Sequence, residues 1–434
     1  MSSQTLTPHL WPDIEITPAA QHDWTFNGQP TRSLTHCYHD YPARMIPQIA
    51  GKLLDTFGRE AALLFDPYCG SGTTLVEAML RGINVAGTDL NPLARLIAEA
   101  KTATPDAAEI DRHIAALQKF ALLAPQSEMP VVTEIHGISR LDFWFKPEVI
   151  EKLSRLKTFI DELDEKSVRL FFQVAFSETV RESSNTRNEE FKLYRYETAR
   201  LEKFKPDVYG IMLSKLRRNR SGLNEFLSAI RHIKPKPRAA IYDFNTVSGI
   251  PAGTLMSGSV DLVITSPPYG DSHTTVAYGQ YSRLSAAWLG LPEPEKIDRK
   301  LMGGSKLAKE MPRFPCQTLN EALAQISERD EKRALEVATF YADLDGSISH
   351  VAALARAGGS VCYVVGNRKV RGVVLPTDEA VRRFFEQFGF EHLDTFYRAI
   401  PNKRMPLRNS PTNAAGSVDD TMTREQIVVL RKRC

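Results

Sequence analysis

The chain has 434 residues, of which 42% are apolar and 25% charged, and its formal net charge at pH 7 is +3. This composition is typical of a globular protein, the net charge does not by itself indicate a polyanionic partner, and no apolar run approaches the roughly 20 residues that span a bilayer. Residues 1–13 lack a signal-peptide pattern and the five cysteines form no CxxC pair or Cys/His cluster, so we expect a cytoplasmic protein without a metal site or disulfide framework.

Residues 1–34 read as a polar lead-in without a clear period. An arm rich in aromatic residues, His and Pro follows at 38–47, before a helical pattern at 49–57. The composition of this arm is equally compatible with a binding segment and with a simple folded N-terminal arm.

A glycine-containing turn follows the apolar run 61–65, which is typical of a buried parallel strand. The turn reads Asp66-Pro-Tyr-Cys-Gly-Ser-Gly-Thr-Thr74, and a helix is expected from Thr74 to Leu80. Gly70 and Gly72 permit a tight turn and close approach of a ligand. The strand, turn and helix start together predict a nucleotide-type cradle whose free N–H groups face the ligand.

A second strand at 83–89 ends in Asp89, which lies 23 residues after Asp66. An acid at this place can accept both hydroxyls of a ribose, as in dinucleotide-binding folds. The turn lacks the G-x-G-x-x-G spacing, however, which argues against a dinucleotide redox enzyme. Asn91-Pro92 then begins a helix that is expected to reach about Lys101.

The region 105–238 differs from the preceding segment in that helical patterns predominate, at 110–123, 147–163 and 167–180. Its last part, 181–238, contains 15 Lys and Arg against 7 Asp and Glu, with aromatic residues interleaved. This clustering favours a phosphate-contacting face over an ordinary solvated helix surface. The basic residues that we expect to contact DNA are Arg187, Lys192, Arg195, Lys215, Arg217 and Arg218 here, with Lys403 and Arg404 in a second cluster further on.

Five further strands are expected after this region, separated by helical patterns at 281–289, 319–355 and 378–388. The alternation predicts an α/β fold with a mostly parallel seven-stranded sheet and helices on both faces. The five strands are 239–243, 261–265, 359–365, 392–400 and 426–431.

The strand 261–265 runs into Ser266-Pro267-Pro268-Tyr269. Two prolines cannot continue a ladder, so the chain leaves the sheet at its carboxyl edge, where open α/β sheets bind ligands. The Ser266 hydroxyl and unpaired carbonyl groups could accept hydrogen bonds from an exocyclic amine, while Tyr269 offers a flat face for its ring. A rigid turn without function is the alternative.

These three motifs, the glycine turn, Gly-Thr-Asp89 and Thr-Ser-Pro-Pro-Tyr269, resemble those of S-adenosylmethionine-dependent DNA amino-methyltransferases. The resemblance implies a Rossmann-like class I methyltransferase fold over about 35–104 and 239–434, with 105–238 as a helical, basic insertion and candidate target-recognition region. Ser before Pro-Pro-Tyr is similar to the N4-cytosine branch, and the same fold acting on adenine N6 remains an alternative. The insertion exceeds what a minimal catalytic domain needs, which leaves the base-recognition contacts unassigned.

The resemblance also implies roles for individual residues. Asp89 would bind the ribose of the cofactor, Asp243 its adenine amine, and Ser266, Pro267, Pro268 and Tyr269 the flipped-out base. The residues implied around the remainder of the cofactor are Tyr41, Pro42, Asp66, Tyr68, Gly70, Gly72, Thr73 and Thr74.

The expected partner is double-stranded DNA at the nucleoid, with a possible cognate restriction endonuclease. An RNA amine methyltransferase and a non-enzymatic nucleic-acid-binding relative are more distant alternatives. Phe314-Pro-Cys316-Gln resembles the Pro-Cys-Gln of cytosine-C5 methyltransferases, but it does not follow a strand of the cofactor region, which argues against that chemistry.

Overall fold

The computed structural model describes residues 24–123, 131–187, 191–270, 277–304, 310–400 and 424–434, together with the backbone of 408–409 and 419–420. A seven-stranded sheet forms its centre, in the order β3-β2-β1-β4-β5-β11-β8. The sheet strands are β1 (Leu63–Asp66), β2 (Asn84–Thr88), β3 (Ala239–Tyr242), β4 (Val260–Thr265), β5 (Ala355–Val365), β8 (Phe390–Ala399) and β11 (Arg424–Lys432). The short pairs are β6 (Lys369–Val370) with β7 (Val373–Val374) and β9 (Arg408–Asn409) with β10 (Asp419–Asp420).

Five strands pair in parallel from β3 to β5, and β11 then runs antiparallel to both β5 and β8. The predicted mostly parallel sheet and Rossmann-like fold are confirmed. The chain order reverses between β1 and β4, so the carboxyl ends of these neighbouring strands border the crevice in which such sheets bind ligands.

Helices flank the sheet, and several begin where a side chain or a proline favours a helix start. Asn91 accepts a hydrogen bond from Leu93 N at the start of α3, and Glu165 and Asp207 cap α7 and α9 in the same way. The helices are η1 (Leu34–Tyr38, 3₁₀), α1 (Pro47–Phe57), α2 (Thr73–Met79), α3 (Pro92–Thr102), α4 (Ala107–Leu123), α5 (Leu141–Trp144), α6 (Pro147–Asp161), α7 (Lys166–Ser183), α8 (Thr198–Lys203), α9 (Val208–Ala229), α10 (Tyr278–Trp288), α11 (Ile297–Lys300), α12 (Gln317–Ser327), α13 (Glu331–Leu354) and α14 (Thr377–Glu386).

Two apolar clusters cover the two faces of the sheet. Phe65 faces the cluster formed with α12, α13 and α14, whereas its neighbour Leu64 faces the cluster formed with α1 and α2, as the alternation of a strand requires. The helical pattern predicted over 319–355 is divided into α12 and α13, because Asp330 caps a new helix through Arg333 N. The expected strand at 359–365 begins earlier, at Ala355.

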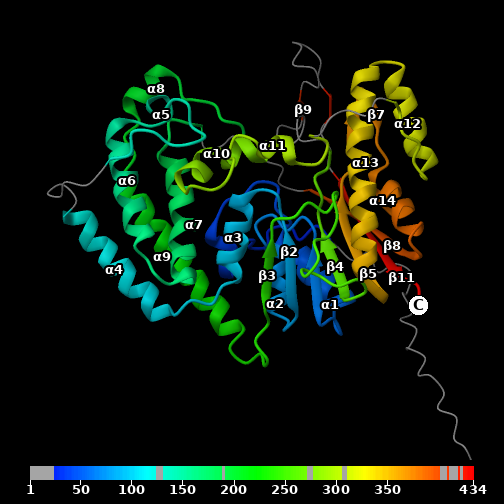
Figure 1. The fold of residues 1–434 in the computed structure, drawn as a ribbon, viewed down its shortest axis with the longest axis horizontal. Coiled ribbons are helices and arrows are strands. Elements are labelled where there is room, and N and C mark those ends of the chain that lie inside the picture. Colours follow the sequence, from blue (N-terminus) through cyan, green and yellow to red (C-terminus); the bar gives the residue numbers. More distant parts are fainter. Residues whose placement is uncertain are drawn as a thin grey trace, which may run out of the picture.

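Helices α4–α9 form a third layer beside the sheet, at the left of Figure 1, and α12–α14 lie at the right. This layer shares one apolar core with α3, α10 and the arm residues Tyr38 and Tyr41. Gly222 of α9 lies against η1 so closely that a Cβ there would be 2.3 Å from the Leu34 carbonyl oxygen. Helices α4–α9 therefore pack closely against η1, the arm, α3 and α10.

Candidate active site

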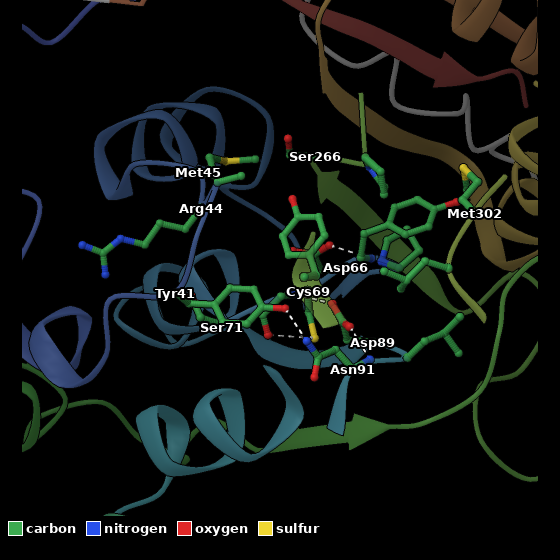
Figure 2. A pocket seen from close by; sticks show the side chains of 18 of the residues that line it. Tyr41, Arg44, Met45, Asp66, Cys69, Ser71, Asp89, Asn91, Ser266 and Met302 are labelled. Carbon is green, nitrogen blue, oxygen red and sulfur yellow. Dashed lines mark hydrogen bonds between the residues drawn. The ribbon is translucent and has the colours of Figure 1, made fainter. Parts of the chain in front are cut away.

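A cavity lies at the carboxyl ends of β1, β2 and β4, where the motif residues converge (Figure 2). Its walls come from the arm before α1, the glycine turn, the segment after β3, the turn after β4, the start of α10 and the segment after α11. The lining residues are Tyr41, Pro42, Ala43, Arg44, Met45, Asp66, Pro67, Tyr68, Cys69, Gly70, Ser71, Thr73, Thr74, Asp89, Leu90, Asn91, Phe244, Asn245, Thr246, Val247, Ser266, Pro268, Tyr278, Leu301 and Met302.

Asp66 ends β1 and is only 2% exposed. Its Oδ1 accepts hydrogen bonds from Thr265 Oγ1 at 2.6 Å and from Tyr68 N at 3.1 Å. Burial nevertheless dominates and raises the pKa of this carboxyl group to about 6, with a smaller contribution from the nearby Asp89 charge. A positively charged ligand in the cavity would favour the ionised form.

Asp89 follows β2 and closes the glycine turn. One carboxylate oxygen accepts from Gly70 N at 3.0 Å, and the other accepts from Asn91 N at 2.8 Å. Burial raises its pKa, although these two backbone donors oppose the shift. An ionised carboxylate offers about four lone-pair positions, so further positions remain for hydroxyl groups of a ligand.

Gly70 and Gly72 both adopt the left-handed backbone region, with φ of 48° and 75°. A side chain at Gly72 would also approach Ala98 of α3 to 3.0 Å. Glycine is therefore required at Gly72 by conformation and by space, which explains the turn signal in the sequence.

Asn91 connects the segment after β2 to the arm and to α10. Its Nδ2 donates to Tyr41 OH at 2.9 Å and to Ser282 Oγ at 2.7 Å, and the Tyr41 ring stacks on Tyr278 with 5.9 Å between centroids. Sequence reasoning used Asn91 only as a helix start and missed Tyr278. The position of Asn91 two residues after the acid that follows β2 was the available signal.

Ser266 lies at the end of β4 and faces the cavity, while Pro268 lines it two residues later. Ser266 Oγ donates to the Tyr269 hydroxyl at 3.2 Å, and that hydroxyl donates to Glu425 Oε1 at 2.9 Å. Burial, reinforced by the Glu425 charge, raises the pKa of Tyr269 well above its usual range, so the hydroxyl keeps its proton. Glu425 was not recognised from the sequence.

The structure separates some predicted site residues from the cavity. Asp243 is exposed and does not line the cavity; Phe244 and Asn245, the next two residues, line it instead. The expected contact of Asp243 with a bound cofactor stays a prediction, and from the segment after β3 it is Asn245 that presents a polar side chain to the cavity. Gly72, Pro267 and Tyr269 lie beside the cavity without lining it.

The predicted basic residues differ in their surroundings. Lys215 and Arg218 form ion pairs with Glu178 of α7, and Arg218 also donates to Tyr38 O at 2.8 Å. These two cations connect α7, α9 and η1, so their charges are already paired within the protein, and their expected contact with DNA phosphates stays a prediction. Arg195 packs on the Phe143 ring. Lys192, Arg187 and Arg217 are exposed, whereas Lys403 and Arg404 lie outside the described residues.

Cys316 is completely buried in the core beneath α12 and does not line the cavity. This location removes the support for cytosine-C5 chemistry through its thiol. Within the described ranges, no group of three or more His, Cys, Asp or Glu side chains is arranged to hold a metal ion. In the same part of the chain, no helix has both the length and the apolar character needed to cross a bilayer.

The strand order, the glycine turn and the acids at the ends of β1 and β2 define a Rossmann-like methyltransferase. A family model described as "UPF0020: RMKL-like, methyltransferase domain" matches residues 35–120. The type II methyltransferase M.MvaI of Kocuria varians is 40% identical in an alignment of 418 residues that covers 92% of this chain and 92% of that protein. The chain therefore belongs to the type II methyltransferase family.

Two further similarities are weaker, one because it is short and the other because it is distant. The type II methyltransferase M.MjaII of Methanocaldococcus jannaschii is 42% identical over 66 residues, which are 15% of this chain and 12% of that protein. The solved structure of the rRNA methyltransferase aviRa from Streptomyces viridochromogenes aligns over 91% of this chain and 88% of its own, with a TM-score of 0.33 and 11% identity.

Proposed function

We propose that this protein is an S-adenosylmethionine-dependent DNA methyltransferase that methylates the exocyclic N4 amine of a flipped-out cytosine within a specific sequence. The observation that carries the proposal is that Ser266, the buried Asp66 and the partly buried Asp89 face one cavity at the reversal point of the sheet. Similarity over nearly the whole chain to a protein named a type II methyltransferase supports it. In this proposal the enzyme acts on DNA in the cytoplasm, as the modification partner of a restriction endonuclease.

The cavity has the chemistry that this cofactor needs. S-adenosylmethionine carries a sulfonium and an ammonium group. Burial makes the carboxyl groups of Asp66 and Asp89 harder to ionise, so a cationic ligand beside them would stabilise their charged forms. Arg44 lines the same cavity, and the charge of Arg95 also acts on Asp89. When bound, the cofactor would supply an activated methyl group. Asp89 would accept from the ribose hydroxyls, Asp66 would face the cationic methionine portion, and Asn245 would take the adenine contact first expected of Asp243.

The predicted role of Ser266 follows from the electronic structure of the target. An aromatic amine is a poor nucleophile because its lone pair is delocalised into the ring. Hydrogen bonds from its N–H groups to Ser266 Oγ and to the Pro267 carbonyl oxygen would localise the lone pair and stabilise the developing positive charge. In a duplex the base is inaccessible, so it must leave the stack and rest against the aromatic and proline surfaces beside Ser266.

A nucleoside analysis tests the proposal. Duplex DNA is incubated with the purified protein and S-adenosylmethionine and digested to nucleosides, and the methylated nucleoside is identified by mass and retention. We expect N4-methylcytosine. N6-methyladenine would replace the cytosine proposal by its nearest rival, methylated RNA alone would favour an RNA amine methyltransferase, and no product from either nucleic acid would favour a binding protein without activity.

Cofactor affinity is expected to depend on pH through Asp66. The carboxyl group is ionised above its pKa of about 6 and protonated below it, so a cationic ligand loses its partner as the pH falls. The affinity should fall by up to about tenfold per pH unit between pH 6 and 4. Titration calorimetry at several pH values measures this slope.

Asp66→Asn should lower the affinity at pH 8 and flatten the pH dependence. Asp55→Asn is the matched control, because Asp55 forms a surface ion pair with Arg81 away from the cavity. An unchanged slope in Asp66→Asn would assign the pH dependence to another group.

The exposed basic residues Lys192 and Arg217 are expected to contact DNA phosphates. Replacing both with Ala should reduce the slope of log affinity against log salt by about 2 and weaken binding uniformly across sequences. Lys332→Ala, an exposed lysine on α13 in the opposite helical layer, is the control and should leave the slope unchanged. Filter binding at several salt concentrations measures both. An unaltered slope in the double variant would place the DNA on another face.

A further inference from the structure

A chain of hydrogen bonds runs from the cavity to the antiparallel end of the sheet. It begins at Ser266 Oγ, passes through the Tyr269 hydroxyl at 3.2 Å, and reaches Glu425 Oε1 at 2.9 Å. Glu425 Oε2 accepts from Arg398 Nη1 at 2.6 Å. Glu425 lies near the start of β11, and Arg398 is its register partner on β8, so two C-terminal strands supply the far end of a chain that starts after β4.

The Arg398–Glu425 pair is largely shielded from water, since the two side chains are only 7% and 13% exposed. The desolvation cost of burying two charges is offset only when both partners are present and hydrogen-bonded to each other. Arg398 therefore cannot serve the DNA backbone as an exposed basic residue would. It balances the charge of a carboxylate that has a second acceptor oxygen available for Tyr269.

The directions of the hydrogen bonds follow from the donors available. An ionised carboxylate can only accept, and a tyrosine hydroxyl carries a single proton. That proton is donated to Glu425, so the Tyr269 oxygen can only accept from Ser266. The Ser266 proton is thereby directed away from the cavity, and the lone pairs of its oxygen are left for the ligand.

An amine that is being methylated needs acceptors for its N–H groups, because positive charge develops on its nitrogen. A Ser266 hydroxyl that pointed its proton into the cavity would repel those groups. The negative charge of Glu425 at the other end also polarises the intervening hydroxyls in the favourable direction.

We infer that Glu425, held by Arg398, is a positioning residue that acts through Tyr269 to present Ser266 to the target amine as an acceptor. This inference rests on the proposed function. It assigns a role in methyl transfer to a residue that belongs to none of the three motifs and does not line the cavity.

The test measures single-turnover methyl transfer to duplex DNA in four proteins: wild type, Glu425→Gln, Ser266→Ala and the double variant. A glutamine can donate to the Tyr269 oxygen and so permits the reversed chain. We expect Glu425→Gln to slow methyl transfer about 10- to 100-fold, as for loss of a hydrogen bond to a charged group. In the Ser266→Ala background the same change should have no further effect.

Two variants separate this role from a structural one. Tyr269→Phe keeps the ring and the Arg398–Glu425 pair but breaks the chain, so it should lose the same rate factor as Glu425→Gln even if the latter folds poorly. Glu391→Gln removes a half-exposed carboxylate of β8 that approaches Arg433 at 3.9 Å, and should transfer methyl groups as the wild type does. Cofactor affinity and thermal midpoint are measured for every variant.

Three outcomes would overturn the inference. The first is a wild-type methyl-transfer rate in both Tyr269→Phe and Glu425→Gln. The second is that Glu425→Gln lowers the rate by the same factor whether or not the Ser266 hydroxyl is present. The third is that Glu425→Gln weakens cofactor binding but leaves the single-turnover rate at saturating cofactor unchanged. If the wild type itself methylates no amine in DNA, the proposed function fails, and the inference fails with it.

Discussion

Asp89→Ala is expected to weaken S-adenosylmethionine binding by about 100- to 1,000-fold, because hydrogen bonds to a charged group contribute roughly 1.5–3 kcal/mol each. The carboxylate has two separate functions. It accepts from Gly70 N and Asn91 N and so holds the glycine turn against the segment after β2, and in the proposed complex it accepts from the ribose. The alanine variant therefore loses the contact with the ribose, and it also removes the acceptor of the Gly70 and Asn91 N–H groups. Titration calorimetry gives the affinity.

Asp106→Ala is the matched control for Asp89→Ala. Asp106 also accepts from a backbone N–H, that of Ala108 at 2.9 Å, but it lies at the exposed start of α4 and not at the cavity. It should lower the thermal midpoint slightly, as loss of a helix cap does, without changing cofactor affinity. Equal affinities for Asp89→Ala and wild type would remove Asp89 from the cofactor site.

Ser266→Ala is expected to lower the methyl-transfer rate on the order of 100-fold while cofactor affinity is unchanged, because the lost hydrogen bond strengthens as charge develops on the amine. The Ser266 oxygen lies at the end of β4, and its hydroxyl proton is directed to Tyr269, so truncation removes an acceptor from the cavity. Rapid-quench kinetics with enzyme in excess over DNA isolates the chemical step from DNA release.

Ser259→Ala is the control for Ser266→Ala. Ser259 directly precedes β4, is partly exposed and does not line the cavity, and its hydroxyl donates to Met256 O at 2.7 Å. Its removal should leave the rate and the affinity at wild-type values. A Ser266→Ala protein that transfers methyl groups at the wild-type rate would contradict the assigned role, and a variant that loses cofactor affinity would relocate Ser266 to the cofactor half of the site.

Much of the candidate site could be predicted because its residues follow directly from strand ends. Asp66, Asp89 and Ser266 each come after a short apolar run, and parallel strands bring their carboxyl ends to one edge of a sheet. Gly70 and Gly72 adopt φ > 0, which glycine tolerates better than other residues, and for this reason the pair indicated a turn in the sequence. Those signals are local, and each can be read from about ten consecutive residues.

Asp243 shows why a local pattern does not determine which side chains line the cavity. The acid follows an apolar strand in the same way as Asp89, yet β3 ends at Tyr242 and the chain turns so that Phe244 and Asn245 reach the cavity. The direction of a side chain just after a strand depends on the next one or two backbone angles. No periodic pattern specifies those angles.

The basic residues show the same limit at longer range. The sequence indicated a positive segment, but not that Lys215 and Arg218 would face Glu178 across the α7–α9 contact. A charge is available to a partner molecule only when the fold has not paired it internally, and pairing between helices is decided by their packing.

The sequence by itself determined the class of fold, the position of the cavity and its two acids, because hydrophobic period and glycine geometry are properties of short segments. Tertiary structure alone decided that Asn91 joins Tyr41 to Ser282, and that Glu425 meets Tyr269. Residues 269 and 425 are brought together by the register of β11 between β5 and β8. Such long-range pairing reflects the packing of the entire sheet, and for that reason it has no local signature in the chain.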